Sequence, residues 1–220
     1  MTDIFDEVTE DLRRQQMLGL WRSYGKYLIA AAVVIVIGVG GYQYWRYHAR
    51  TVQERESAAF AEAIALLEQG KTDDGLAALA TLQETAGGGY RLLAGLREAA
   101  ERERRGDTAA AIKIYERLAT DKAIDETLRG YAELQAVAAQ IDQGDAAALR
   151  PRLEKLAAPN APWSALAEEF LALLDLKAGN VAAARERLDR LAQNEDAPAG
   201  ARTRAGEILT TLPQATESAK

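Results

Sequence analysis

Four glycines, each followed by a polar residue, recur at nearly constant spacing along the chain. They are Gly70, Gly106, Gly144 and Gly179, and the intervals between them are 36, 38 and 35 residues. Each glycine stands where a helical pattern of apolar residues ends, and glycine is favoured there because it adopts the left-handed conformation that caps a helix. The residue after each of the last three is Asp or Asn, which can cap the next helix. The spacing therefore predicts four tight turns, each joining two helices.

Apolar residues keep a fixed register to these glycines. A leucine occurs twelve residues after every glycine, a leucine or tyrosine nine residues after it, and an alanine or valine seven residues before it. In this order the residues are Leu82, Leu118, Leu156 and Leu191; Leu79, Tyr115, Leu153 and Leu188; and Ala63, Ala99, Val137 and Ala172. Small residues allow two helices to approach closely, and a repeating register lets each unit bury its apolar face against the next. The pattern predicts an all-α solenoid of four helical hairpins without a β-sheet.

The helix boundaries follow from the same pattern and from helix-breaking residues. We expect helices at 52–69, 73–86, 90–105, 108–120, 124–143, 145–157, 162–178, 180–193 and 198–212. Gly87-Gly88-Gly89 and Pro159-Asn160-Ala161-Pro162 are expected to be loops between hairpins, since such residues stop helices. The last helix would cap the final hairpin, and residues 214–220 would form a polar tail.

The second and fourth units resemble the tetratricopeptide repeat. The segment Gly106-Asp107-Thr108-Ala109-Ala110-Ala111-Ile112-Lys113-Ile114-Tyr115-Glu116-Arg117-Leu118 is similar to the turn and second helix of that family, with its alanine at Ala111. Gly179-Asn180-Val181-Ala182-Ala183-Ala184 is similar, with Ala184 at the same place. The other two units depart from the pattern, with Leu149 and Gly75 at this position. The resemblance implies a divergent tetratricopeptide-like domain.

A second feature precedes the repeats. The stretch from Tyr27 to Trp45 contains no charged residue, and nineteen helical residues span about the thickness of a bilayer's hydrocarbon core. Tyrosines and Trp45 flank its apolar centre, and aromatic rings favour the level of the lipid headgroups. We expect a single transmembrane helix at 27–46. The alternatives are a buried core helix and a cleaved signal peptide, but an acidic segment precedes the run and bulky residues follow it, unlike a cleavage site.

The amino-acid composition argues against catalysis. The chain has one histidine, His48, and no cysteine, so Ser-His pairs and His- or Cys-based metal sites are not expected in the repeats. Carboxylate pairs such as Asp73-Asp74 and Glu168-Glu169 fall at helix starts or on polar faces. Residues 51–220 carry 21 basic and 28 acidic side chains, a poor balance for binding nucleic acid. We expect a non-enzymatic protein with no cofactor, metal, nucleic acid or small-molecule substrate; an enzyme with a carboxylate-only site is the rival hypothesis.

Protein binding is the function that remains. In tetratricopeptide proteins the first helix of each pair lines a concave groove, and the offset from each glycine assigns nine residues to that lining. They are Phe60, Ile64, Leu96, Ala100, Leu134, Ala138, Ile141, Leu173 and Leu176. Such a lining would suit an apolar or amphipathic segment. The alternative for each residue is burial in the core between hairpins.

The arrangement as a whole resembles the YfgM-like family, the ancillary subunits of the bacterial SecYEG translocon. The segment Gly19-Leu20-Trp21-Arg22-Ser23-Tyr24-Gly25-Lys26-Tyr27 is similar to the family's corresponding segment. The resemblance implies a single-pass inner-membrane protein with a cytoplasmic N-terminus, a periplasmic repeat domain, and the translocon and periplasmic chaperones as partners. An adaptor of another envelope machine, serving cytochrome maturation, cell division or outer-membrane assembly, is the alternative.

These interpretations divide the chain into four parts. Residues 1–26 would be a short cytoplasmic segment, 27–46 the transmembrane helix, 47–213 the repeat domain and 214–220 the tail. The number of basic residues just before the expected transmembrane helix exceeds the number just after it by only one. The expected orientation in the membrane therefore depends on the family resemblance.

Overall fold

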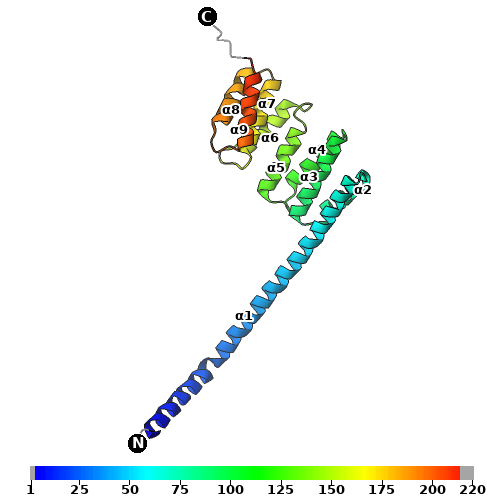
Figure 1. Cartoon of the computed structure of the whole chain (residues 1–220). Helices are drawn as coiled ribbons and strands as arrows, with labels where there is room; N and C mark the ends of the chain where they lie inside the picture. The colour runs from blue at the N-terminus through cyan, green and yellow to red at the C-terminus, as the bar shows by residue number, and fades with distance from the viewer. Residues whose placement is uncertain (1–2, 214–220) are drawn as a thin grey trace. The chain divides into compact units, whose positions relative to one another are not determined.

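The computed structural model describes the backbone of residues 3–213 and the side chains of residues 26–27 and 33–213. The described backbone forms nine helices (Figure 1). Their bounds are α1 Asp3–Glu68, α2 Thr72–Thr85, α3 Gly88–Arg104, α4 Thr108–Thr120, α5 Glu126–Ala138, α6 Ala146–Leu156, α7 Ser164–Lys177, α8 Val181–Gln193 and α9 Ala199–Thr211. The expected polar tail at 214–220 lies outside the described residues.

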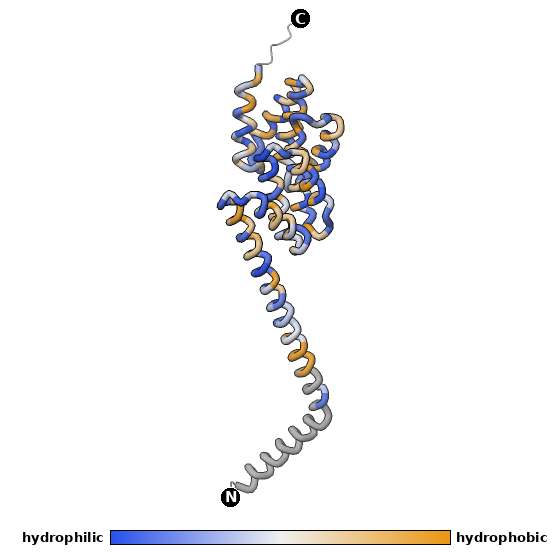
Figure 2. The backbone as a smooth tube through the Cα atoms, turned by 90° about the vertical axis from the view of Figure 1, so that its right-hand side faces the viewer, coloured by the Kyte–Doolittle hydropathy of each residue, from blue (hydrophilic) through white to orange (hydrophobic). Residues whose placement is uncertain are grey.

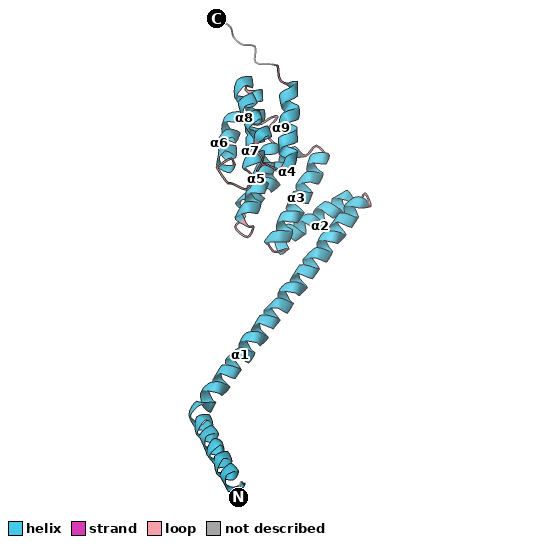
Figure 3. Cartoon of the chain, turned by 60° about the vertical axis from the view of Figure 1, so that its left-hand side comes forward, coloured by secondary structure: helices cyan, strands magenta, loops and turns pink. Residues whose placement is uncertain are grey.

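The described part of the chain contains helices and turns but no strand (Figure 3). It divides into two compact units, Met1–Arg55 and Glu56–Lys220. In the second unit each helix packs against its neighbours in the chain, from α2 through α9. This arrangement confirms the all-α helical repeat. The domain boundary expected at residue 47 remains a prediction.

Three of the four turn glycines behave as the sequence predicts. Gly70, Gly106 and Gly179 have φ of 76°, 82° and 78°, in the left-handed region. After each of them, a backbone N–H reaches back five residues to a helix carbonyl, as at Asp107 N to Arg102 O (2.8 Å) and Asn180 N to Asp175 O (2.8 Å). This is the hydrogen bond of the Schellman motif, which closes a helix on a left-handed glycine.

The third turn differs from the other three. Helix α5 ends at Ala138, five residues before the predicted end, and the chain reaches Gly144 through short turns with hydrogen bonds such as Gln143 N to Gln140 O (3.2 Å). Gly144 does not have a positive φ. The Lys177 ammonium, from the next hairpin, donates to the carbonyls of Ile141, Asp142 and Gly144 at 2.9–3.1 Å. A cation from α7 therefore satisfies carbonyls that would otherwise belong to a longer α5.

The core follows the predicted register closely. The four residues seven positions before the glycines, Ala63, Ala99, Val137 and Ala172, are each 0% exposed. The residues nine positions after them are also buried, as are Leu82, Leu118 and Leu191 twelve positions after. Leu156, at the same position in the third hairpin, is only half-buried. The third hairpin is thus irregular both at its turn and in its core.

The prediction of a transmembrane helix at 27–46 is wrong. Among the described residues, no helix is long and apolar enough to cross a membrane. The apolar run Val33–Val39 belongs to α1, and Gln43, Arg46 and His48 follow it in the same helix (Figure 2). The expected single-pass inner-membrane localisation depended on that helix, and this finding contradicts it.

The helix caps give a first test of the fold. Asp145 Oδ1 accepts a hydrogen bond from Ala147 N (2.9 Å) at the start of α6, whereas the side chain of Asn180 makes no such bond at the start of α8. We expect Asp145→Ala to lower the free energy of unfolding by about 1 kcal/mol and Asn180→Ala by about 0.3 kcal/mol or less, because only the first removes a capping bond. Urea denaturation of both variants checks this. Equal losses would contradict the assignment of the caps.

Candidate functional site

The nine residues predicted to line a groove have different environments in the structure. Leu134 is 1% exposed and belongs to the core between α5, α6 and α7. Phe60, Leu96, Ile141 and Leu176 are half-buried and pack against core clusters with one side. Ile64, Ala100, Ala138 and Leu173 are half-buried and are not part of any core cluster of the described residues.

These last four residues occupy equivalent positions. Each stands six residues before its turn glycine, on α1, α3, α5 and α7, and directly follows the fully buried small residue of the register. One helical position therefore separates a side chain in the core from one that retains contact with solvent. The four residues form a set, here called the inner row, to which each hairpin contributes one apolar side chain.

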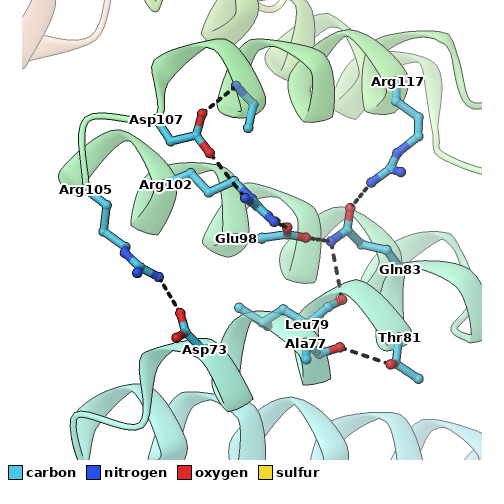
Figure 4. Close-up of polar contacts among 11 residues, drawn as sticks. Asp73, Ala77, Leu79, Thr81, Gln83, Glu98, Arg102, Arg105, Asp107 and Arg117 are labelled. Carbon is cyan, nitrogen blue, oxygen red and sulfur yellow. Dashed lines mark hydrogen bonds and ion pairs between the residues drawn. The ribbon is translucent and has the colours of Figure 1, made fainter.

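A polar network joins the first two hairpins (Figure 4). Gln83 of α2, buried at 5% exposure, donates through Nε2 to Glu98 and accepts from Arg117 of α4 through Oε1. Glu98 of α3, buried at 3%, in turn accepts from Arg102 Nε at 2.7 Å. Buried polar groups rigidify a structure when all of them are paired, so the network fixes the positions of α2, α3 and α4.

A second network joins the last hairpins. Asp175 of α7 accepts from Arg150 of α6 at 2.6 Å and from Arg187 of α8 at 2.9 Å. Arg187 also pairs with Glu168 at 2.8 Å. Glu169 accepts two hydrogen bonds from Arg204 of α9, at 2.6 and 2.7 Å. Sequence reasoning did not find these pairs. The sequence spacing could have indicated one of them, because Arg204 follows Glu169 by 35 residues, which is about the length of one repeat.

A cavity of about 710 Å³ lies where the third hairpin is irregular. The cavity was not predicted from the sequence, although the loop with Pro159 and Pro162 that borders it was. Its walls come from the end of α4, the first half of α5, the second half of α6 and the loop before α7. The lining includes Gly130, Pro151, Leu156, Pro162 and Trp163 among its apolar residues, and Glu126, Arg129, Glu133, Arg152 and Lys155 among its charged ones.

Two side chains of the cavity wall are held in place by contacts with neighbouring residues. Trp163 donates from Nε1 to Thr127 O at 2.6 Å and packs on Tyr131 with ring centroids 5.1 Å apart. Arg152 forms a two-pronged pair with Glu133, from Nε at 2.6 Å and from Nη2 at 3.1 Å. The hydrogen bond to Glu133 is the main cause that raises the pKa of Arg152 above its ordinary value, so its charge is permanent. The cavity is therefore preformed.

Comparison of the sequence with known families gives one match, to the tetratricopeptide repeat-like domain, over residues 19–186. The chain belongs to this family. The matched range contains all four turn glycines, the part of α1 from residue 19 onward, and α2 through α7. Searches of curated proteins and of solved structures gave no significant match. The membership confirms the resemblance to tetratricopeptide proteins, and the resemblance to the YfgM-like family remains a prediction.

The carboxylates singled out in the sequence include partners of arginine. Asp73 pairs with Arg105 at 2.8 Å, and Glu168 and Glu169 pair with Arg187 and Arg204. In the described part of the chain, no group of His, Cys, Asp and Glu residues could hold a metal ion. Asp73 and Glu169 thus join a hairpin to the element that follows it, and Glu168 joins the two helices of one hairpin.

Proposed function

We propose that the tetratricopeptide-like domain is a non-catalytic scaffold that binds a protein partner along its inner row. The observation that carries the proposal is the repeated position six residues before each turn, which is apolar in all four hairpins and half-exposed in all four. A residue needed only for the core would be buried, as its neighbour one position earlier is. Apolar side chains that recur on one helix of each hairpin provide a surface that extends along the repeat and suits an apolar or amphipathic segment.

The rigidity of the domain supports the same function. The networks around Gln83 and Asp175 join helices of successive hairpins, so the inner row is presented by a framework with little freedom to rearrange. A rigid surface loses less conformational entropy when a partner binds than a mobile one does. Family membership points the same way, because tetratricopeptide-like domains mediate contacts between proteins.

The identity of the partner is the finer part of the proposal. We infer the SecYEG translocon and its associated chaperones from the similarity of residues 19–27 and of the repeat order to the YfgM-like family. An adaptor of another envelope machine is the competing assignment. Crosslinking in intact cells followed by mass spectrometry separates the two, since recovery of the components of a different machine would contradict the inferred partner.

The inner row itself is tested by substitution. We expect the double variant Ile64→Gln/Leu173→Gln to lose about tenfold in affinity for the crosslinked partner while its melting temperature stays within a few degrees of the wild type, because both side chains already contact solvent. Leu134→Gln, at a buried neighbour of the row, should instead lower the free energy of unfolding by about 3 kcal/mol. Pull-downs with purified partner and thermal melts on the same samples measure both effects.

Two outcomes would contradict the proposal. Unchanged partner affinity in the folded Ile64→Gln/Leu173→Gln variant would show that the inner row is not the binding surface. A large drop in its melting temperature would show that these residues are part of the core after all.

A further inference from the structure

We propose that the cavity of the third hairpin is a second binding site, for a short segment of a partner protein that places a bulky apolar side chain beside a carboxylate. None of the nine predicted groove residues lines this cavity. The inference therefore goes beyond the proposed function and can fail or hold independently of it.

The first argument is that the repeat leaves this space open. The position twelve residues after the turn glycine is buried by Leu82, Leu118 and Leu191 in the other hairpins, but Leu156 is half-buried and faces the cavity. Helices α5 and α6 approach each other less than α7 and α8 do, and a loop from residue 157 to 163 separates α6 from α7. Leu156 packs against the core of α5, α6 and α7 with one side, so part of an apolar side chain that the register would bury fully remains available to a ligand.

The second argument is the shape and rigidity of the wall. A volume of about 710 Å³ lies within the range of ligand pockets, roughly 300–1,000 Å³. Trp163 is fixed by its bond to Thr127 O and by Tyr131, and a Cβ at Gly130 would come within 2.9 Å of the Trp163 ring. Glycine at 130 is therefore required for the indole to lie against α5. Fixed aromatic and proline surfaces, here from Trp163, Pro151 and Pro162, are favourable contacts for peptide side chains.

The third argument is the charge of the lining. Glu133 neutralises Arg152, which also approaches Glu116 at 3.5 Å. Arg129 donates from Nη1 to Ile124 O at 2.7 Å, and neither it nor Lys155 has an acidic partner within the described residues. Glu126 is the one lining acid without such a pair in that part of the chain, and its place in the first turn of α5 lets the helix dipole offset its charge. The excess of positive charge, in a domain that is acidic overall, favours a carboxylate on the ligand.

The test uses the purified full chain and fluorescein-labelled short peptides. One peptide alternates leucine with glutamate, a second alternates leucine with lysine, and a third alternates serine with glutamate. Fluorescence anisotropy should show saturable binding of the leucine–glutamate peptide below about 1 mM, with at least tenfold weaker binding of the other two. The affinity should fall between about 50 mM and about 500 mM salt, because an attraction between partly exposed charges is screened.

Variants locate the binding. Lys155→Glu should weaken binding of the leucine–glutamate peptide about tenfold, whereas Lys113→Glu, which makes the same charge change at an exposed position of α4 outside the cavity, should change it less than about twofold. Both lysines are exposed, so both variants should melt like the wild type. The inner-row variant Ile64→Gln/Leu173→Gln should bind the peptide normally.

Several results would overturn the inference. They are equal binding of all three peptides, no saturable binding, equal effects of Lys155→Glu and Lys113→Glu, or loss of binding in the inner-row variant. Self-association of the chain that is lost in Lys155→Glu without any peptide binding would assign the cavity to a second copy of the chain, and would overturn it as well.

Discussion

Replacing Gly88 with alanine should lower the free energy of unfolding by about 3 kcal/mol, because a Cβ at this position meets backbone rather than a mobile side chain. The added atom would lie 2.0 Å from the carbonyl oxygen of Ala123 and 2.9 Å from its carbon. Gly88 is the first residue of α3, and Ala123 belongs to the loop between α4 and α5. The substitution therefore forces apart two segments that the fold brings together.

The loop has little freedom to move away. Asp121 accepts from Ala123 N at 2.8 Å and pairs with Arg91 of α3 at 2.9 Å, and these hydrogen bonds lower the pKa of Asp121 below its ordinary value. Next to it, Ile124 is 2% exposed. The hydrogen bonds of Asp121 and the buried side chain of Ile124 thus hold the loop against the start of α3.

Gly89 is the matched control. It lies in the same turn of α3, and a Cβ there would meet nothing within 4 Å. Gly89→Ala should raise the free energy of unfolding by about 0.5 kcal/mol, because alanine restricts the unfolded chain and favours the helix. Chemical denaturation of both variants measures the two changes, and for a domain of this size the Gly88→Ala variant should melt roughly 10 °C lower. Equal effects at the two glycines would contradict the close approach.

The second large effect is expected at Asp175. This carboxylate is 4% exposed and joins Arg150 and Arg187, so Asp175→Asn leaves two guanidinium groups around a neutral amide. We expect the free energy of unfolding to fall by about 2–3 kcal/mol, less than for a fully buried pair because both arginines reach solvent. The exposed pair of Arg190 and Glu186 supplies the control, and Glu186→Gln should cost about 0.5 kcal/mol or less.

Urea denaturation of the two variants, with the slope of the transition compared, separates loss of stability from loss of structure. If Asp175→Asn unfolds at the same urea concentration as Glu186→Gln, the bridge through Asp175 does not stabilise the packing of α6 and α8 on α7.

The hairpin register was predictable from the sequence because it depends on local chemistry. A glycine that ends a helix, a small residue where helices approach and a leucine at a fixed offset each have a preference that acts within a few residues. These preferences agree in the second and fourth units, where helices such as α4 begin and end as predicted. They were misleading at residues 139–143, where the helical pattern continues but the chain forms short turns, and Lys177 of the next hairpin donates to the carbonyls of Ile141 and Asp142 in these turns.

The site was less predictable for the same reason. Offsets from the glycines identified which positions of the first helices are apolar, but Leu134 is in the core and Leu173 is half-exposed, although both matched the groove pattern. Burial depends on which neighbouring helix covers a side chain, and that depends on the loop lengths and angles between hairpins. The transmembrane helix expected at residues 27–46 is contradicted, because no helix of the described residues is long and apolar enough to cross a membrane.

The sequence by itself determined most helices of the repeat, three of the four turns and most of the buried positions, because each depends on interactions between residues close in the chain; it did not determine that the first of these helices continues α1 from Asp3. Tertiary structure alone decided which arginine pairs with which carboxylate across about one repeat, how early α5 ends, and that Leu156 borders a cavity as well as packing against the core. Those features depend on the distances between hairpins. The packing of all the helices together sets these distances, so no single residue predicts them.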